Sequence, residues 1–168
     1  MPDQPAAAAG ATAPRRSILF VCTGNTCRSP LAEALCRKLL AARLGVGEGE
    51  LEARGFVVRS AGVAAVPGDE ATPEAAEVAR EFGADLSAHR SRPVNPDLLA
   101  GATDVVAMTA AHAAMLALQF PGLGPPPALL STGGDLPDPF GCDLGVYREC
   151  ARAIQAQLDR LVKEWLGP

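Results

Sequence analysis

The chain has few aromatic residues and no excess of positive charge. Aromatic side chains make up 4% of its 168 residues, and the formal net charge is -4. Proteins that bind nucleic acid usually present a basic face, and those that bind single strands often add aromatic platforms on which bases stack. We therefore expect no nucleic-acid partner.

Long apolar runs are also missing, since none approaches the roughly 20 residues that a membrane-spanning helix requires. The first 16 residues, MPDQPAAAAGATAPRR, are rich in Ala and Pro and lack the pattern of a secretory signal. We expect residues 1–16 to form a disordered tail and residues 17–168 to form one domain. We also expect no membrane partner and a cytoplasmic location.

The five cysteines are an odd number, which does not suit a disulfide framework. A cytosol would keep all of them reduced. Cys36 and Cys150 stand at apolar helix positions, and we expect them to be small buried residues. Cys22 and Cys27 stand instead around a polar loop, in the stretch ILFVCTGNTCRSPLAEALC.

Strand-like and helix-like segments alternate along the chain. Short apolar runs predict strands at 18–21, 56–59, 104–108 and 128–130. Apolar periodicity predicts helices from residue 30 to Gly45, over 72–82, before Pro121, and from about Asp143 to the end. This order predicts a single-domain α/β fold, with four parallel strands in one sheet and helices on both faces.

Several residues are typical of helix starts and helix faces. Ser29 and Thr72 can cap the first two helices, because each precedes a proline suited to a first turn. We expect the last helix to bury one face, made of Val146, Cys150, Ile154, Leu158, Leu161 and Trp165.

The segment CTGNTCRS is therefore a loop between a buried strand and a helix. Ligands of such sheets bind beyond the carboxyl ends of the strands, where Cys22 would lie. The helix N-terminus favours an anion, and Gly24 lets the backbone turn inward. Arg28 can return to the same centre and bind two oxygens of a tetrahedral oxyanion. That positive environment would favour the thiolate of Cys22.

A thiolate next to a phosphate cradle indicates phosphoryl transfer to cysteine. The Gly-Lys-Ser/Thr ending of a nucleotide-binding loop is missing. The leaving group of such a transfer needs a proton, and Asp138 in LPDPFG is a candidate donor. The predicted ligands are phosphate or other oxyanions.

These motifs resemble the low-molecular-weight protein tyrosine phosphatases in order and spacing. The resemblance rests on VCTGNTCRSPLAE, SAG at 60–62, SAHRSRPV at 87–94 and DPFG at 138–141, and it covers roughly residues 17–165. It implies a flavodoxin-like phosphatase fold, phosphorylated protein substrates, no cofactor and no metal. A monomer is the default state of the family.

The resemblance also implies roles for individual residues. Cys22 would be the nucleophile that forms a phosphocysteine, Arg28 would bind the phosphoryl group, and Asp138 would protonate the leaving group. The rest of the substrate site would comprise Thr23, Gly24, Asn25, Thr26, Cys27, Ser29 and Phe140.

Within this set Asn25 and Ser29 would brace the loop, and Ser29 would donate a hydrogen bond to the Cys22 thiolate. Ser60 and His89 match positions that support the loop from behind. In relatives, the cysteine that matches Cys27 can form a disulfide with the nucleophile under oxidants, and the same switch is expected here.

Two residues favour phosphoarginine over phosphotyrosine as the substrate. Thr26 replaces the bulky aliphatic residue of tyrosine-specific members, and Phe140 replaces a tyrosine; both are similar to the protein arginine phosphatase branch. A hydroxyl can bond the polar phosphoguanidinium, and a phenyl ring can pack on its plane. A phosphotyrosine phosphatase remains the alternative.

Two further alternatives come from other classes. An arsenate reductase would need two more cysteines in a segment after the second helix, but residues 84–115 contain none. A non-catalytic oxyanion-binding or redox module would not need Asp138. His112 is expected at a solvated helix position, and the role of Cys142, close to Asp138, stays open.

Overall fold

The computed structural model describes residues 15–168. It contains four parallel strands in one sheet, ordered β2-β1-β3-β4. The strands are β1 (Arg16–Cys22), β2 (Phe56–Gly62), β3 (Asp104–Ala107) and β4 (Ala128–Leu129). The helices are α1 (Arg28–Leu44), η1 (Glu48–Glu50), α2 (Pro73–Glu81), α3 (Pro96–Ala100), α4 (Ala110–Gln119) and α5 (Leu144–Leu166).

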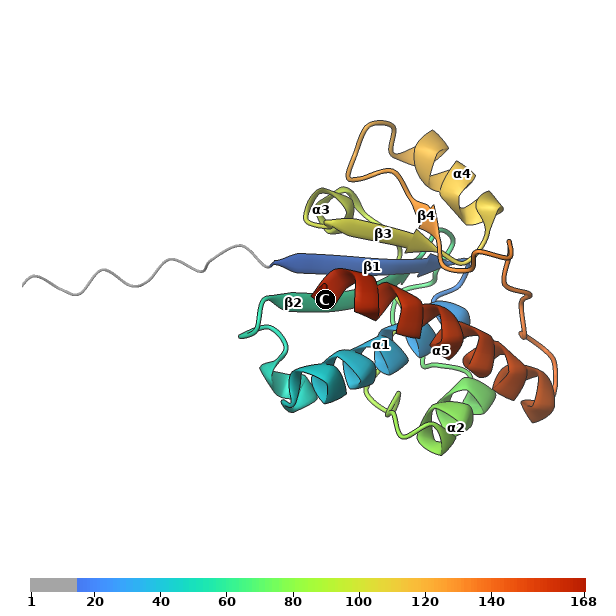
Figure 1. The fold of residues 1–168 in the computed structure, drawn as a ribbon. Coiled ribbons are helices and arrows are strands. Elements are labelled where there is room, and N and C mark those ends of the chain that lie inside the picture. Colours follow the sequence, from blue (N-terminus) through green and yellow to red (C-terminus); the bar gives the residue numbers. More distant parts are fainter. Residues whose placement is uncertain (1–14) are drawn as a thin grey trace, which may run out of the picture.

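Helices cover both faces of the sheet, as predicted (Figure 1). Helices α1, α2 and α5 pack on one face, around the inward side chains of Ile18 and Phe20. Helices α3 and α4 lie on the other face, where Leu19 and Val21 meet Leu99 and other apolar residues. Adjacent residues of β1 thus pack into opposite cores, which explains why the strand is apolar from Ile18 onward.

Side chains at the helix ends account for where most helices begin. Thr72 accepts a hydrogen bond from the backbone of Ala75, as predicted for α2, and Asp143 accepts one from Val146 at the start of α5. Helix α1 ends at Gly45, whose φ of 66° is left-handed and favours glycine. These caps confirm the boundaries expected for three helices to within two residues.

Three details of the prediction were wrong. Helix α1 begins at Arg28 rather than Pro30, and Ser29 is not its cap, because its hydroxyl is used elsewhere. In α5 the buried face includes Tyr147 and Val162, whereas Val146 is exposed. The short helices α3 and η1 were not predicted, because neither is long enough to show an apolar period.

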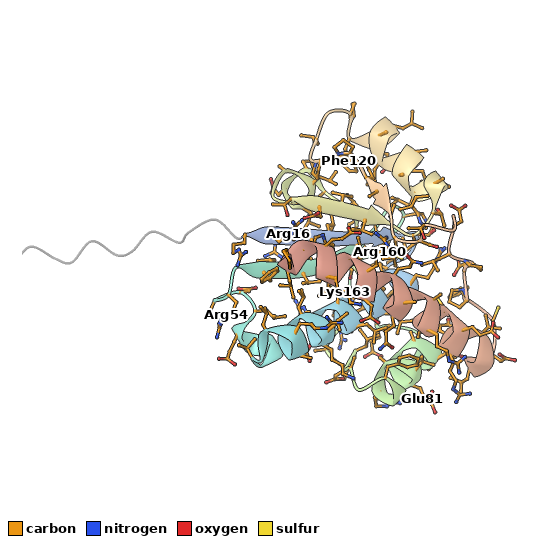
Figure 2. The ribbon with its side chains drawn as sticks, viewed as in Figure 1. Arg16, Arg54, Glu81, Phe120, Arg160 and Lys163 are labelled. Carbon is orange, nitrogen blue, oxygen red and sulfur yellow. The ribbon has the colours of Figure 1, made fainter. Side chains whose placement is uncertain are left out.

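Residue Arg16 opens β1, so it belongs to the fold rather than to the predicted tail. Its guanidinium pairs with Asp104 at 2.9 Å and lies over the ring of Trp165 near the end of α5; Figure 2 labels it at the start of the strand. Arg15 is described too, with its guanidinium over the ring of Phe56, and residues 1–14 of the predicted tail fall outside the described residues. Within residues 15–168 no helix is both long and apolar enough to cross a membrane.

Candidate active site

A pocket of about 200 Å³ opens at the carboxyl end of β1, where the sequence predicted the site. The last residue of β1, Cys22, pairs in register with Gly62 at the end of β2. The loop from Cys22 to Arg28 then forms most of the wall. The pocket is lined by Cys22, Thr23, Gly24, Thr26, Cys27, Arg28, Asp138 and Phe140.

The carbonyl groups of this loop are bound on its outer side. The carbonyl oxygens of Cys22 and Thr23 accept hydrogen bonds from Val63 and Ala64, and that of Thr26 accepts one from Thr72. Carbonyls that are held outside the loop leave its backbone N–H groups free to face an anion inside, next to the N-terminus of α1.

Asn25 shapes the middle of the loop. Its φ of 57° makes it the one non-glycine residue with positive φ among residues 15–168, and asparagine tolerates this left-handed conformation better than most residues. The side chain is fully buried. Its amide donates to Ser29 and Ser60, both at 2.9 Å, and its oxygen accepts from the backbone of Arg92 at 3.0 Å.

His89 binds the same residue from behind, since its Nε2 donates to the carbonyl oxygen of Asn25 at 2.7 Å. Arg92 adds a second contact there, from its Nε to the carbonyl oxygen of Ser60 at 3.0 Å. Ser60 in turn donates to Glu33 on α1. Ser60 and His89 therefore support the loop without lining the pocket, as the sequence predicted.

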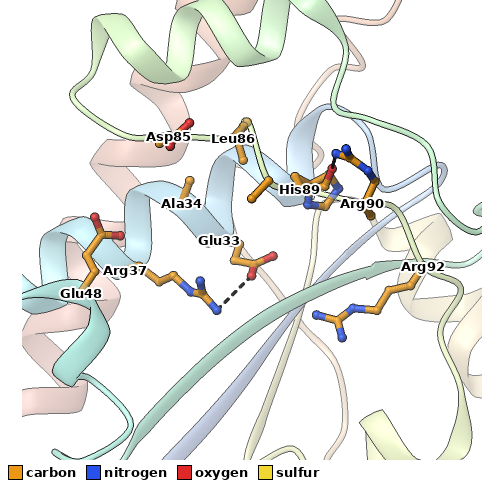
Figure 3. Close-up of a pocket in the computed structure, with 10 residues that line it drawn as sticks. Glu33, Ala34, Arg37, Glu48, Asp85, Leu86, His89, Arg90 and Arg92 are labelled. Atoms are coloured by element: carbon orange, nitrogen blue, oxygen red, sulfur yellow. Dashed lines mark hydrogen bonds and ion pairs between the residues drawn. The ribbon is translucent and has the colours of Figure 1, made fainter.

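Glu33, His89 and Arg92 also line a second hollow, of about 240 Å³, which shares no lining residue with the pocket (Figure 3). Glu33 pairs there with Arg37 at 3.4 Å, and the side chain of Arg92 points toward the same space. The hollow is thus part of the scaffold behind the loop, and it lacks the cysteine and the aspartate of the pocket.

The buried thiol of Cys22 has one close polar partner. Its Sγ lies 2.9 Å from the Oγ of Ser29, which also accepts a hydrogen bond from Asn25. With that lone pair occupied, the serine hydroxyl is free to donate to the sulfur. A donated hydrogen bond stabilises a thiolate, so the sequence-based role of Ser29 fits the geometry.

Arg28 is 4% exposed and reaches across the floor of the pocket. One Nη donates to the carbonyl oxygen of Leu136 at 2.8 Å, and the other lies 3.5 Å from the carboxylate of Asp138. The guanidinium is thereby fixed between α1 and the segment that contains Asp138, with donors available for oxyanion binding.

Asp138 and Phe140 form the opposite wall. The carboxylate of Asp138 is about half exposed and accepts a hydrogen bond from the backbone of Phe140 at 3.1 Å. The phenyl ring is 67% exposed, so it stands at the mouth of the pocket rather than in the core. A titratable acid and a flat apolar surface thus face the thiol from a distant part of the sequence.

Cys27 is buried and contacts a small polar cluster that the sequence did not reveal. Its Sγ lies 3.3 Å from the hydroxyl of Tyr147 and 3.7 Å from that of Thr72. Burial and the neighbouring Cys27 raise the pKa of Tyr147. The sulfur is therefore held toward α5, although Cys27 also lines the pocket.

Gly62, the last residue of the SAG motif at 60–62, has a structural role that the sequence did not indicate. A Cβ at this position would collide with the backbone oxygen of Thr23 and would lie 3.0 Å from the backbone nitrogen of Asn25. Only glycine lets β2 approach the loop this closely.

The prediction for His112 was wrong. It is 4% exposed rather than solvated, and its Nε2 lies 2.8 Å from the hydroxyl of Thr23. The burial of His112 could not be predicted, because the many alanines of α4 do not indicate which side of the helix is buried. The predictions for Cys36 and Cys150 were right, since both are buried, whereas Cys142 is exposed.

No group of three or more His, Cys, Asp or Glu side chains within residues 15–168 is arranged to hold a metal ion.

A cysteine thiol, an arginine and an aspartate that line one pocket define a cysteine-dependent phosphatase. The chain belongs to the family described as low molecular weight phosphotyrosine protein phosphatase, whose sequence model matches residues 17–166.

Several relatives within this family carry a more specific name. The chain is 38% identical to a protein-arginine-phosphatase of Geobacillus stearothermophilus and 39% identical to one of Bacillus subtilis. Each alignment covers 88% of this chain, with 94% and 95% of the relative. The fold is also similar to a solved structure of the YwlE arginine phosphatase with a phosphorylated active-site serine. That match has a TM-score of 0.77 and 39% identity, and it covers 88% of this chain and 94% of the other.

Proposed function

We propose that this phosphatase hydrolyses phosphoarginine in proteins, through a phosphocysteine intermediate on Cys22. The observation that carries the proposal is the composition of one pocket: Thr26 and Phe140 line it together with Cys22, Arg28 and Asp138. Relatives named protein-arginine-phosphatase, at 38% and 39% identity, support the same substrate.

In the first step the Cys22 thiolate attacks phosphorus while the bond from phosphorus to the guanidine nitrogen breaks. Asp138 gives its proton to the departing nitrogen, so that arginine leaves as a guanidine or a guanidinium rather than as an anion. Arg28 and the loop N–H groups bind the phosphoryl oxygens, which carry the charge of the transition state.

In the second step water attacks the phosphorus of the phosphocysteine. Asp138, now a carboxylate, accepts a proton from that water as the sulfur–phosphorus bond breaks. Phosphate leaves, Cys22 returns as a thiolate and Asp138 is again protonated. Ser29 supports both steps, because its hydroxyl can donate to the sulfur whenever the sulfur carries charge.

Thr26 and Phe140 account for the preference between substrates. An arginine side chain brings polar N–H groups into the pocket, and each loses its water on entry. The Thr26 hydroxyl offers such a group a partner, whereas an aliphatic residue would not. The exposed Phe140 ring can stack on the flat guanidinium at the pocket mouth.

The test is to measure kcat/KM on phosphoarginine and phosphotyrosine peptides of matched sequence, with Cys22→Ser as the blank. We expect a preference of tenfold or more for phosphoarginine, which corresponds to ~1.4 kcal/mol of transition-state binding. Thr26→Ile should shift the preference toward phosphotyrosine, and Thr26→Ser should keep it. A wild-type preference for phosphotyrosine would refute the arginine assignment and leave a tyrosine phosphatase.

We further propose that the enzyme acts as a monomer in the cytoplasm. The absence of a membrane-spanning helix within residues 15–168 is compatible with this location. Sedimentation at micromolar concentration would test the oligomeric state.

A further inference from the structure

His112 lies beside the pocket but is not part of its lining. It belongs to the first turn of α4, which starts just after the carboxyl end of β3. Its backbone N–H donates to Thr109, and the backbone N–H of Ala110 donates to Asp135. These two contacts fix the helix start, so the imidazole is held in place beside the loop.

The imidazole makes one polar contact, from Nε2 to the Oγ1 of Thr23 at 2.8 Å. Its Nδ1 is buried and has no hydrogen-bond partner within the described part of the chain. A buried ring nitrogen without a partner costs free energy, so an apolar side chain would suit this position better if packing were its only role. The contact with Thr23, which directly follows Cys22, offers a reason to keep a histidine there.

The ring is neutral near pH 7. Burial lowers the pKa of His112, and the positive charge of Arg28 on α1 lowers it further; Asp138 and Asp135 oppose this effect more weakly. A neutral imidazole has one N–H and one bare nitrogen. An unpaired buried N–H is rarer than an unpaired acceptor, which assigns the hydrogen to Nε2 and leaves Nδ1 bare.

With this tautomer, His112 donates to the Thr23 oxygen, and the hydroxyl hydrogen of Thr23 must point elsewhere. Thr23 lines the pocket beside Cys22. We propose that His112 is a positioning residue that turns the Thr23 hydroxyl into a hydrogen-bond donor for an oxyanion in the pocket. The inference rests on the phosphatase reaction proposed above and adds a side-chain donor to the backbone donors of the loop.

The first test is a double-mutant cycle on kcat/KM for an aryl phosphate, a substrate that does not depend on the preference for arginine. His112→Leu removes the donor, and Thr23→Val removes the hydroxyl at nearly constant shape. We expect each single change to lower kcat/KM by about tenfold and the double variant to lose no more than Thr23→Val alone. His112→Gln should recover most of the activity, because its amide can donate from a similar reach.

Two outcomes of this cycle would overturn the proposal. His112→Leu with unchanged kcat/KM would show that the contact has no role in the reaction. Equal losses from His112→Leu with and without the Thr23 hydroxyl would show that the histidine acts through the fold alone. Thermal unfolding of each variant identifies any loss that is due only to a smaller folded fraction.

The affinity for inorganic phosphate, measured by titration calorimetry, separates this proposal from the proposed function. Wild-type protein that binds phosphate but turns over no phosphorylated substrate would refute the function. The positioning role would still require weaker phosphate binding by His112→Leu and Thr23→Val, each by about tenfold. No phosphate binding by the wild type would refute both.

An NMR titration of the imidazoles tests whether His112 lies close enough to a bound oxyanion to respond to its charge. The chain has two histidines, and His112→Gln assigns their signals. The second test uses sulfate, which keeps its charge over this pH range. A dianion next to the Thr23–His112 pair favours the charged ring, so the pKa of His112 should rise at saturating sulfate. A titration unaffected by bound sulfate would place His112 outside the oxyanion site.

Discussion

Replacing Asn25 tests two separate contributions of this residue to the shape of the loop, its side-chain hydrogen bonds and its left-handed backbone. Its side chain makes three buried hydrogen bonds, to Ser29, Ser60 and the backbone of Arg92. Its backbone is left-handed, with φ at 57°. Asn25→Ala removes the hydrogen bonds and strains the backbone, whereas Asn25→Gly removes the same hydrogen bonds but accepts the conformation.

The expected free energies follow from these contacts. Three hydrogen bonds at ~1 kcal/mol each give a loss of about 3 kcal/mol for either variant. A left-handed alanine adds ~1–2 kcal/mol, and the greater freedom of glycine in the unfolded chain offsets ~0.4–1 kcal/mol of that difference. We therefore expect Asn25→Ala to be the less stable of the two by about 1 kcal/mol.

Urea denaturation at equilibrium gives both stabilities, and kcat/KM at the same temperature gives the activities. After correction for the folded fraction, both variants should lose tenfold or more in kcat/KM, because Asn25 no longer holds Ser29 against Cys22. An alanine variant as stable as the glycine variant would refute the role of backbone conformation. A total loss below about 1 kcal/mol would refute the value given to the three hydrogen bonds.

Three further predictions concern glycine and cysteine positions. Gly62→Ala should push β2 away from the loop and lower both the melting temperature and kcat/KM, and a fully active variant would contradict the close approach. Alkylation at pH 8 followed by mass spectrometry should label the exposed Cys142 before Cys150. Burial raises the pKa of Cys150 to about 11, so only roughly a thousandth of this thiol is thiolate at pH 8. The labelling of Cys150 should therefore speed up as the pH rises, and equal rates for the two cysteines at pH 8 would contradict this. Brief hydrogen peroxide treatment should link Cys22 to Cys27, with activity restored by dithiothreitol; irreversible loss without that disulfide would exclude the switch.

Most of the fold could be predicted from the sequence, because the strands are short apolar runs and the helices α1, α2 and α5 repeat apolar residues on one side. The residues that line the pocket were all among those predicted, since Cys22 and Arg28 share one loop and Asp138 stands in a motif known from relatives. Asn25 and Ser29, predicted with them, are buried and do not line the pocket. The contacts that depend on tertiary packing could not be predicted. His112 lies 89 positions from Thr23 along the chain, and no local pattern shows that α4 turns this residue toward β1.

The same limit applies to Tyr147 and to Val146. A shift of one residue in the buried face of α5 decides which of the two meets Cys27, and apolar periodicity alone does not fix a helix face that closely. Val146 fits the apolar pattern better, but it is Tyr147 whose hydroxyl contacts Cys27 and Thr72.

The segment that contains His89 and Arg92 touches Asn25 only from behind the loop. Neither residue lines the pocket, yet both hold Asn25, the residue whose left-handed backbone shapes the loop. A protease cut or a substitution in this segment would therefore abolish activity, although it is remote from the pocket. Every catalytic side chain would remain chemically intact.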